Sequence, residues 1–183
     1  VLDEKSIYVK GRECFLLLAI DIGTFDIIHF DLVEIEDDST IEQFILVIRD
    51  IIKYPFKGVV SDLLPSFIGV LRRVLHGIPH HYCTRHYYSS TEFYIKYRYT
   101  GRNKCWSENL LKIVHIIAYT KSYTVALRAL NYLLRNEAQF RDARLTKRIN
   151  LLRKRFPNLT KHFLHPGMPR DNNIAETIIR QLN

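Results

Sequence analysis

Short apolar runs separated by turn residues fill the start of the chain. Residues 5–10, 14–22 and 26–35 have the length and the β-branched content of strands. The connections between them, at Gly11-Arg12 and Gly23-Thr24, are short enough to join antiparallel neighbours. We therefore predict an antiparallel meander of three strands, whose first strand also includes the residues just before the first run.

Helices and strands alternate after this meander. Ser39 followed by Glu42 is a capping box that would open the first helix. Apolar spacing predicts a helix over 41–52, a strand over 58–61, a helix from about Pro65 to Gly77 and a strand over 79–83. Three strands followed by helix, strand, helix and strand is the order of elements in an RNase H-like core.

The second half of the chain has the periodicity of helices. Apolar residues recur at helical spacing over 107–156, and Pro157 should end the last helix of this stretch. A loop over 165–171 then leads to a final helix that begins at Asn172 or Asn173. Three helices are predicted before that loop. The first begins at Ser107, the second covers 122–135 and the third covers 138–156.

The predicted fold class is therefore α/β. We expect an RNase H-like core with a mixed sheet, in which three antiparallel strands precede parallel strands and helices flank the sheet. An all-helical insertion interrupts this core. The expected organisation is a first part of the core over 1–90, a basic helical insertion over 91–164, and a return to the core with its last helix over 165–183.

Charge is distributed unevenly along the 183 residues. The net charge is +8, but the segment from Lys96 to Lys161 alone carries 16 Lys and Arg against 3 acids, a net +13. Such a segment beside an acidic one suits a polyanion such as DNA, although a basic helix can also be simply solvated. The best candidates for phosphate contacts are Lys147, Arg148, Arg153, Lys154 and Arg155.

Composition excludes some classes of protein. No apolar run reaches the roughly 20 residues that a membrane span needs, so we expect no membrane partner. Three cysteines are too few for a disulfide framework and favour a reducing, intracellular compartment. The sequence begins at Val1 and ends in what looks like an unfinished helix, so we expect a fragment of a longer protein whose DNA-recognition domain lies upstream.

Three carboxylates stand at the ends of elements that meet in such a core. Asp3 lies on the first strand, Asp62 directly ends the fourth, and Glu176 is in the first turn of the last helix. Phosphodiester chemistry commonly uses two hard cations about 3.5–4 Å apart, held by acids from separate elements. We expect these three acids to converge as catalytic residues and to hold two Mg²⁺ or Mn²⁺ ions.

Each acid also has a structural alternative. Asp3 could be a solvated residue, and Asp21 at the end of the second strand is its rival as the first ligand. The Asp-Ile-Gly context of Asp21 predicts a hairpin turn equally well. Asp62 could cap the helix that follows it, and Asn173 with Glu176 has the spacing of a capping box.

The order and spacing of four short motifs resemble those of DDE-type transposases of prokaryotic insertion sequences. Leu2-Asp3-Glu4-Lys5 is similar to their opening strand, and Val59-Val60-Ser61-Asp62 to the strand of their second Asp. Tyr82-Cys83-Thr84-Arg85-His86 matches the Cys-x-x-His motif of Mutator-like relatives, and Asp171-Asn172-Asn173-Ile174-Ala175-Glu176 resembles the segment before their last Glu. The 113 residues between Asp62 and Glu176 fit members that carry a helical insertion.

This resemblance implies an enzyme that cuts DNA at transposon ends and joins it to a target. It further implies a homodimer or higher oligomer of the full-length protein, in the cytoplasm and associated with the nucleoid. Two alternatives are a domesticated or inactive transposase-derived DNA-binding protein and another RNase H-like nuclease. The presence of all three acids argues against the first, and the long basic insertion against the second.

A few other side chains could contribute to a site. Cys83 and His86 are two soft ligands, whereas structural zinc normally takes four, so we expect a buried Cys and a hydrogen-bonded His beside the active site. The aromatic residues of the insertion could stack on bases or belong to the core. The sequence leaves this choice open for Trp106, Tyr94, Tyr97 and Tyr99.

Overall fold

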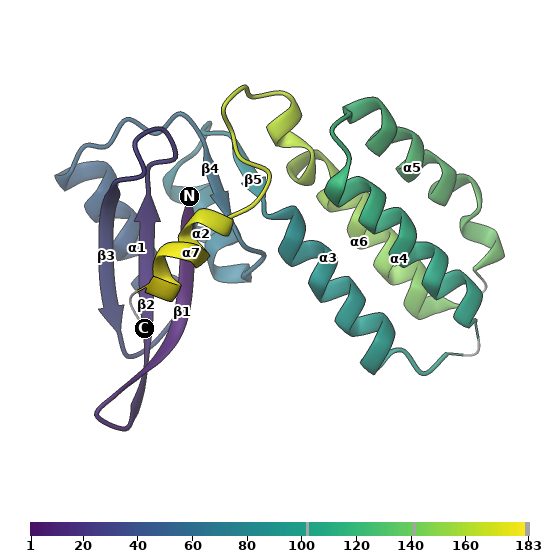
Figure 1. Cartoon of the computed structure of the whole chain (residues 1–183), viewed down its shortest axis with the longest axis horizontal. Coiled ribbons are helices and arrows are strands. Elements are labelled where there is room, and N and C mark those ends of the chain that lie inside the picture. The colour runs from purple at the N-terminus through teal and green to yellow at the C-terminus, as the bar shows by residue number, and fades with distance from the viewer. Residues whose placement is uncertain (102, 141, 182–183) are drawn as a thin grey trace. The chain divides into compact units, whose positions relative to one another are not determined.

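The structure is a computed structural model that describes residues 1–101, 103–140 and 142–181 (Figure 1). The chain divides into two compact units: an α/β unit of Val1–Cys83 with Gly167–Asn183, and a helical unit of Thr84–Pro166. The helical unit begins before residue 91, where we expected it, because a helix starts directly after Cys83. The α/β class is confirmed.

The predicted meander forms the larger sheet. Strands β1 (Leu2–Val9), β2 (Arg12–Ile20) and β3 (Ile27–Val33) pair antiparallel in the order β1-β2-β3. Lys10 and Gly11 both have positive φ, 50° and 80°, which matches the two-residue turns that best fit the twist of a hairpin. The sheet register pairs Asp3 with Leu18, so their side chains point to the same face.

Two short parallel strands form a second sheet. Strands β4 (Val59–Ser61) and β5 (His80–Tyr82) pair with each other, and β4 lies against β1 without joining its ladder. The expectation of one mixed sheet is therefore wrong for the described strands. β4 is only three residues long, and the backbone bonds at its ends, from Val59 N–H to Pro79 O and from Cys83 N–H to Ser61 O, join it to the residues on either side of β5.

Helices cover both faces of the larger sheet (Figure 1). On one face α1 (Asp38–Leu46), its π-helical extension Val47–Ile51 and α2 (Pro65–Val74) bury a core. This core is built from Leu2, Leu17, Ala19, Ile41, Phe44, Ile45, Ile48, Val59, Phe67, Val70, Leu71 and Leu75. On the other face Leu18 and Ile20 pack against α7 (Asn173–Gln181). Because Asp3 shares the face of Leu18, it points toward α7.

The first helix starts earlier than its sequence pattern indicated. Asp37 is the N-cap, and its Oδ1 accepts a hydrogen bond from Thr40 N–H at 2.8 Å. The predicted capping box from Ser39 is therefore wrong, because a carboxylate two residues earlier takes that role.

The helical unit consists of four α-helices with short turns between them. They are α3 (Thr84–Phe93), which continues as a π-helix over Tyr94–Arg98, α4 (Lys104–Tyr119), α5 (Tyr123–Arg135) and α6 (Ala143–Leu159), with 3₁₀ turns at Glu137–Gln139 and Lys161–Phe163 among the described residues.

Three predicted boundaries in this unit were wrong. Ser107 lies inside α4 and donates to Lys104 O, while Asn103 occupies the N-cap. Helix α6 begins later than residue 138 because Asp142 caps it, accepting from Arg144 N–H at 2.8 Å. Pro157 does not end α6, which runs to Leu159; this close to a C-terminus a proline removes only one helical hydrogen bond.

Candidate active site

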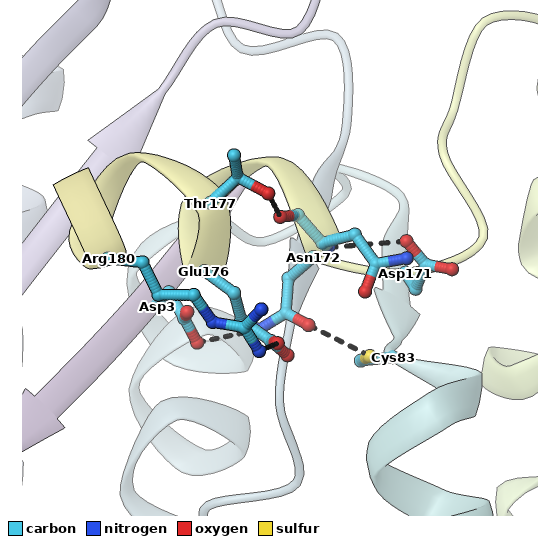
Figure 2. Close-up of polar contacts among 8 residues, drawn as sticks. Asp3, Cys83, Asp171, Asn172, Glu176, Thr177 and Arg180 are labelled. Carbon is cyan, nitrogen blue, oxygen red and sulfur yellow. Dashed lines mark hydrogen bonds and ion pairs between the residues drawn. The ribbon is translucent and has the colours of Figure 1, made fainter.

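Asp3 is a buried acid whose position is fixed from the far end of the chain. Its residue is only 5% exposed, and Asn172 Nδ2 donates to its Oδ1 at 2.6 Å (Figure 2). Burial, then the charges of Asp62 and Glu176, raise the pKa of Asp3 from 3.8 to about 7, while the hydrogen bond from Asn172 opposes the shift. Strand β1 lies against β4 and α7, the elements that position Asp62 and Glu176, so the three predicted acids lie in one region of the α/β unit.

Asp62 follows β4 and is half-buried. Its Oδ1 accepts from Leu64 N–H at 3.0 Å, which shapes the turn into α2. This bond does not cap the helix, because Leu64 is the N-cap residue of α2 and none of the described side chains caps the helical N–H groups. The capping alternative for Asp62 is therefore wrong. The same carboxylate faces Asp3 closely enough to shift its pKa. A turn role and a ligand role are compatible because a carboxylate has two oxygens.

Glu176 is half-buried in the first turn of α7. Its Oε2 lies 3.6 Å from Nη2 of Arg180, whose side chain is largely exposed (Figure 2). Glu176 N–H donates to the carbonyl of Asn172 at 3.2 Å, and Asn173 is the first helical residue. The capping-box alternative for Asn173 and Glu176 therefore fails, because Asn173 is not at the N-cap.

Asp21, the rival first ligand, belongs to a turn. Its Oδ1 accepts from Gly23 N–H at 2.6 Å, and Tyr54 OH donates to its Oδ2. The bond from Tyr54 and then that from Gly23 hold the pKa of Asp21 below its ordinary value. The acids that raise the pKa of Asp3 are Asp62 and Glu176, so the hairpin interpretation of Asp21 is the one that the structure supports.

Two further acids lie beside Asp62 that sequence reasoning missed. Burial, and then the charges of Asp62, Glu36 and Asp3, raise the pKa of Glu4 to about 8. Burial and Asp62 also raise the pKa of Glu36. Within the described part of the chain, Glu4 Oε2 and Glu36 Oε1 are buried without a hydrogen-bond partner. The sequence did offer a signal for Glu4, because it directly follows Asp3. Strand alternation places the two side chains on opposite faces of β1, but the charge of Asp62 raises the pKa of both.

Cys83 supports the same site from β5. It is fully buried, and its Sγ donates to Asn172 Oδ1 at 3.1 Å (Figure 2). His81 Nε2–H donates to the carbonyl of Arg170 at 2.9 Å, which holds the loop before α7. His86 lies on α3 in the helical unit and is half-buried. The structure thus gives Cys83 a contact within the α/β unit and places His86 in the other unit.

Asp3, Asp62 and Glu176 offer the oxygen ligands that a divalent cation prefers, but they are not close enough together to hold one. Within residues 1–101, 103–140 and 142–181, no group of three or more His, Cys, Asp or Glu side chains is arranged to hold a metal ion. Asp3, Asp62 and Glu176 would have to draw closer around one. The donor set still fits a hard divalent cation, because these are carboxylate oxygens whose mutual repulsion a cation would relieve.

The five predicted phosphate contacts divide into two groups on α6. Lys147, Arg153 and Lys154 are exposed, whereas Arg148 and Arg155 are half-buried. The Arg148 guanidinium lies 3.9 Å from the centroid of the Tyr94 ring. All five lie off the buried stripe of Leu145, Ile149, Leu152, Phe156 and Leu159, as predicted. The structure nevertheless gives Arg148 a contact within the unit.

Three of the four aromatic residues in question make contacts inside the helical unit. Trp106 packs on Phe140 with ring centroids 4.7 Å apart, and Tyr99 OH donates to Asp142 Oδ2 at 2.7 Å. Tyr94 lies under Arg148. For these residues the packing interpretation is the one that the structure supports.

Tyr97 differs from the other three. It is 72% exposed, and Phe93, 52% exposed, lies beside it with ring centroids 5.3 Å apart. The Arg98 guanidinium lies 5.7 Å from the centroid of the Phe93 ring. An exposed aromatic pair next to a cation is the arrangement that stacks on unpaired bases.

No family model matches the chain, and no curated protein matches it. Across the described residues, every helix is too short or too polar to cross a membrane.

Proposed function

We propose that this chain is the catalytic core of a DDE-type transposase with an RNase H-like fold, in which Asp3, Asp62 and Glu176 hold Mg²⁺ or Mn²⁺. The observation that supports the proposal most is the position of Asp3, which is buried on β1 between β4 and α7 and accepts a hydrogen bond from Asn172 at the start of α7. The charges of Asp62 and Glu176 add to burial in raising its pKa. Acids from β1, from the end of β4 and from α7 are far apart in the sequence. Their convergence is unexplained by stability, since burying like charges is unfavourable.

The residues of the chain would prepare the reaction by fixing two of the three carboxylates. Asn172 holds one oxygen of Asp3, and Leu64 N–H holds one oxygen of Asp62, so both groups enter the site with defined directions. Two divalent cations, when bound, would activate a water or a DNA 3′-hydroxyl and stabilise the leaving oxygen. Glu176 pairs with the largely exposed Arg180 and would supply the third carboxylate from the first turn of α7.

The helical unit would bind the DNA. Thr84–Pro166 contains 17 of the 27 Lys and Arg residues but only 4 of the 19 Asp and Glu residues. Lys147, Arg153 and Lys154 are exposed cations on α6 and suit phosphates. Tyr97 and Phe93 would stack on unpaired bases.

A second candidate is a transposase-derived protein that binds DNA without cutting it. The basic helical unit supports this candidate as well as the first, because 17 of the 27 Lys and Arg residues lie in it. The two candidates share the basic helical unit and differ only in whether the acidic site binds a cation.

Nicking of supercoiled plasmid with and without Mn²⁺ tests the proposal. Asp62→Asn keeps the oxygen that accepts from Leu64 N–H but removes the charge, so we expect nicking to fall by at least about 1,000-fold while duplex binding is unchanged. Asp31→Asn is the matched control, because Asp31 is exposed on β3 and likewise accepts a backbone N–H, that of Leu32.

Wild-type nicking by Asp62→Asn would remove Asp62 from the mechanism. Tight DNA binding by the unaltered chain with no Mn²⁺-dependent nicking would select the second candidate instead.

A further inference from the structure

One buried amide joins the two elements that carry Asp3 and Glu176. Asn172 is fully buried at the start of α7, and its Nδ2 donates to Asp3 Oδ1 at 2.6 Å. Its main-chain carbonyl accepts from Glu176 N–H at 3.2 Å, which is the first helical hydrogen bond of α7. A single residue therefore contacts one acid through its side chain and the other through its backbone (Figure 2).

The orientation of this amide is fixed from its other end. Cys83 Sγ donates to Asn172 Oδ1 at 3.1 Å, so the carbonyl side of the amide faces the thiol and the nitrogen side faces Asp3. Cys83 is itself held, because its N–H donates to Ser61 O at 2.8 Å. The contacts thus run from β5 through Asn172 to β1.

We propose that Asn172 is a positioning residue for cation binding, which aims the Asp3 carboxylate at Asp62 and Glu176 and is itself held by Cys83. This inference rests on the proposed function, since it concerns the same acids. Outer partners that hold a ligand by hydrogen bonds commonly change metal affinity by about 10- to 100-fold when they are removed.

No other common side chain reproduces these contacts. Aspartate at 172 would place a carboxylate against Asp3 Oδ1, which repels it, and would keep the acceptor for Cys83. Alanine would leave buried groups of both Asp3 and Cys83 without this partner. A longer side chain would have to displace a fully buried neighbour.

Mn²⁺ binding, followed by the EPR signal of free Mn²⁺ during titration of the whole chain, tests the inference without any cleavage assay. We expect Asn172→Ala to weaken Mn²⁺ binding by about 10-fold or more and Asn172→Asp to weaken it as well. The matched control is Thr177→Ala, which removes a hydroxyl bond to Asn173 O on the exposed side of the same helix. Circular dichroism without metal checks that each variant folds.

A pair of Cys83 variants keeps the test decisive if Asn172→Ala does not fold. Cys83→Ser retains a donor to Asn172 Oδ1 and should bind Mn²⁺ nearly as the unaltered chain does, whereas Cys83→Ala should bind more weakly. Unaltered affinity in folded Asn172→Ala, or equal affinity of the two Cys83 variants, overturns the inference and leaves the proposed function standing. Absence of Mn²⁺ binding by the unaltered chain overturns both.

Discussion

The two units of the molecule carry opposite charge and place it differently. The α/β unit has the remaining 10 basic and 15 acidic residues, and some of its acids are buried together around Asp62. The helical unit is strongly basic, and the cations on the outer side of α6 are exposed. Exposed like charges weaken a fold little, whereas buried ones are unfavourable unless a ligand compensates them. The buried acids of the α/β unit therefore repel one another when they are charged, whereas the exposed cations of the helical unit weaken its fold little.

The largest expected effect on DNA binding comes from reversing the exposed charge of the helical unit. Changing Lys147, Arg153 and Lys154 together to Glu should weaken binding to any duplex by roughly 100-fold. The slope of log K against log salt should flatten by about 0.9 for each phosphate that no longer meets a cation. The fold should persist because these side chains are exposed. Fluorescence anisotropy over a range of salt concentrations measures both quantities.

The matched control reverses three exposed cations of the α/β unit, Lys53, Lys57 and Arg72, which gives the same change in net charge. If this control weakens binding as much as the α6 variant, net charge rather than the helical unit determines affinity, and the two units do not differ in the way described.

The next effect is a dependence of stability on pH that comes from the buried acids of the α/β unit. The pKa of Asp3 is raised from 3.8 to about 7 in the fold. The protonated Asp3 therefore contributes fully to the free energy of unfolding below about pH 4, and this contribution is lost as the pH rises through 7. Asp3→Asn removes that loss because an amide does not ionise, and its side-chain oxygen can still accept the hydrogen bond from Asn172 Nδ2. We expect it to raise the free energy of unfolding at pH 8 by roughly 1–3 kcal/mol and to change it little at pH 4.

Asp21→Asn is the opposite case, because the pKa of Asp21 is lowered by its bonds from Tyr54 and Gly23. Its charged form is favoured in the fold, so this variant should lose stability at pH 8 rather than gain it. Urea unfolding at the two pH values compares the variants. A gain for Asp21→Asn, or none for Asp3→Asn, would contradict the picture of repulsion around Asp3.

The α/β unit was the more predictable of the two from sequence. Its meander follows from strand-length apolar runs with tight turns, and Asp3, Asp62 and Glu176 were chosen because they stand at element ends. The split into two sheets could not be foreseen, because it depends on how the three-residue strand β4 directs its few backbone bonds. Glu4 was missed because strand alternation places Asp3 and Glu4 on opposite faces of the sheet. It does not show that the charge of Asp62 acts on both side chains.

Helix α3 was the main omission in the helical unit. Its buried residues are Thr84, Tyr87 and Thr91, which have helical spacing but include two polar side chains. Thr91 OH donates to Tyr87 O at 2.9 Å, so its polar group is satisfied within the helix. A search for apolar stripes does not find such a helix. Likewise, sequence alone could not separate Arg148 from Lys147, since only the packing shows which of them lies over Tyr94.

The smallest expected effect tests that separation of neighbouring cations. The Arg148 guanidinium lies 3.9 Å from the Tyr94 centroid, so Arg148→Ala should lower the free energy of unfolding by about 1 kcal/mol because it removes the cation–π interaction. Lys147→Ala, on the exposed side of the same helix, should change stability by less than about 0.5 kcal/mol and weaken DNA binding instead. A double-mutant cycle with Tyr94→Leu isolates the pair, and coupling near zero would mean that Arg148 is free to contact phosphate. In that case the five cations predicted to contact phosphates would act as one surface, as the sequence alone suggested.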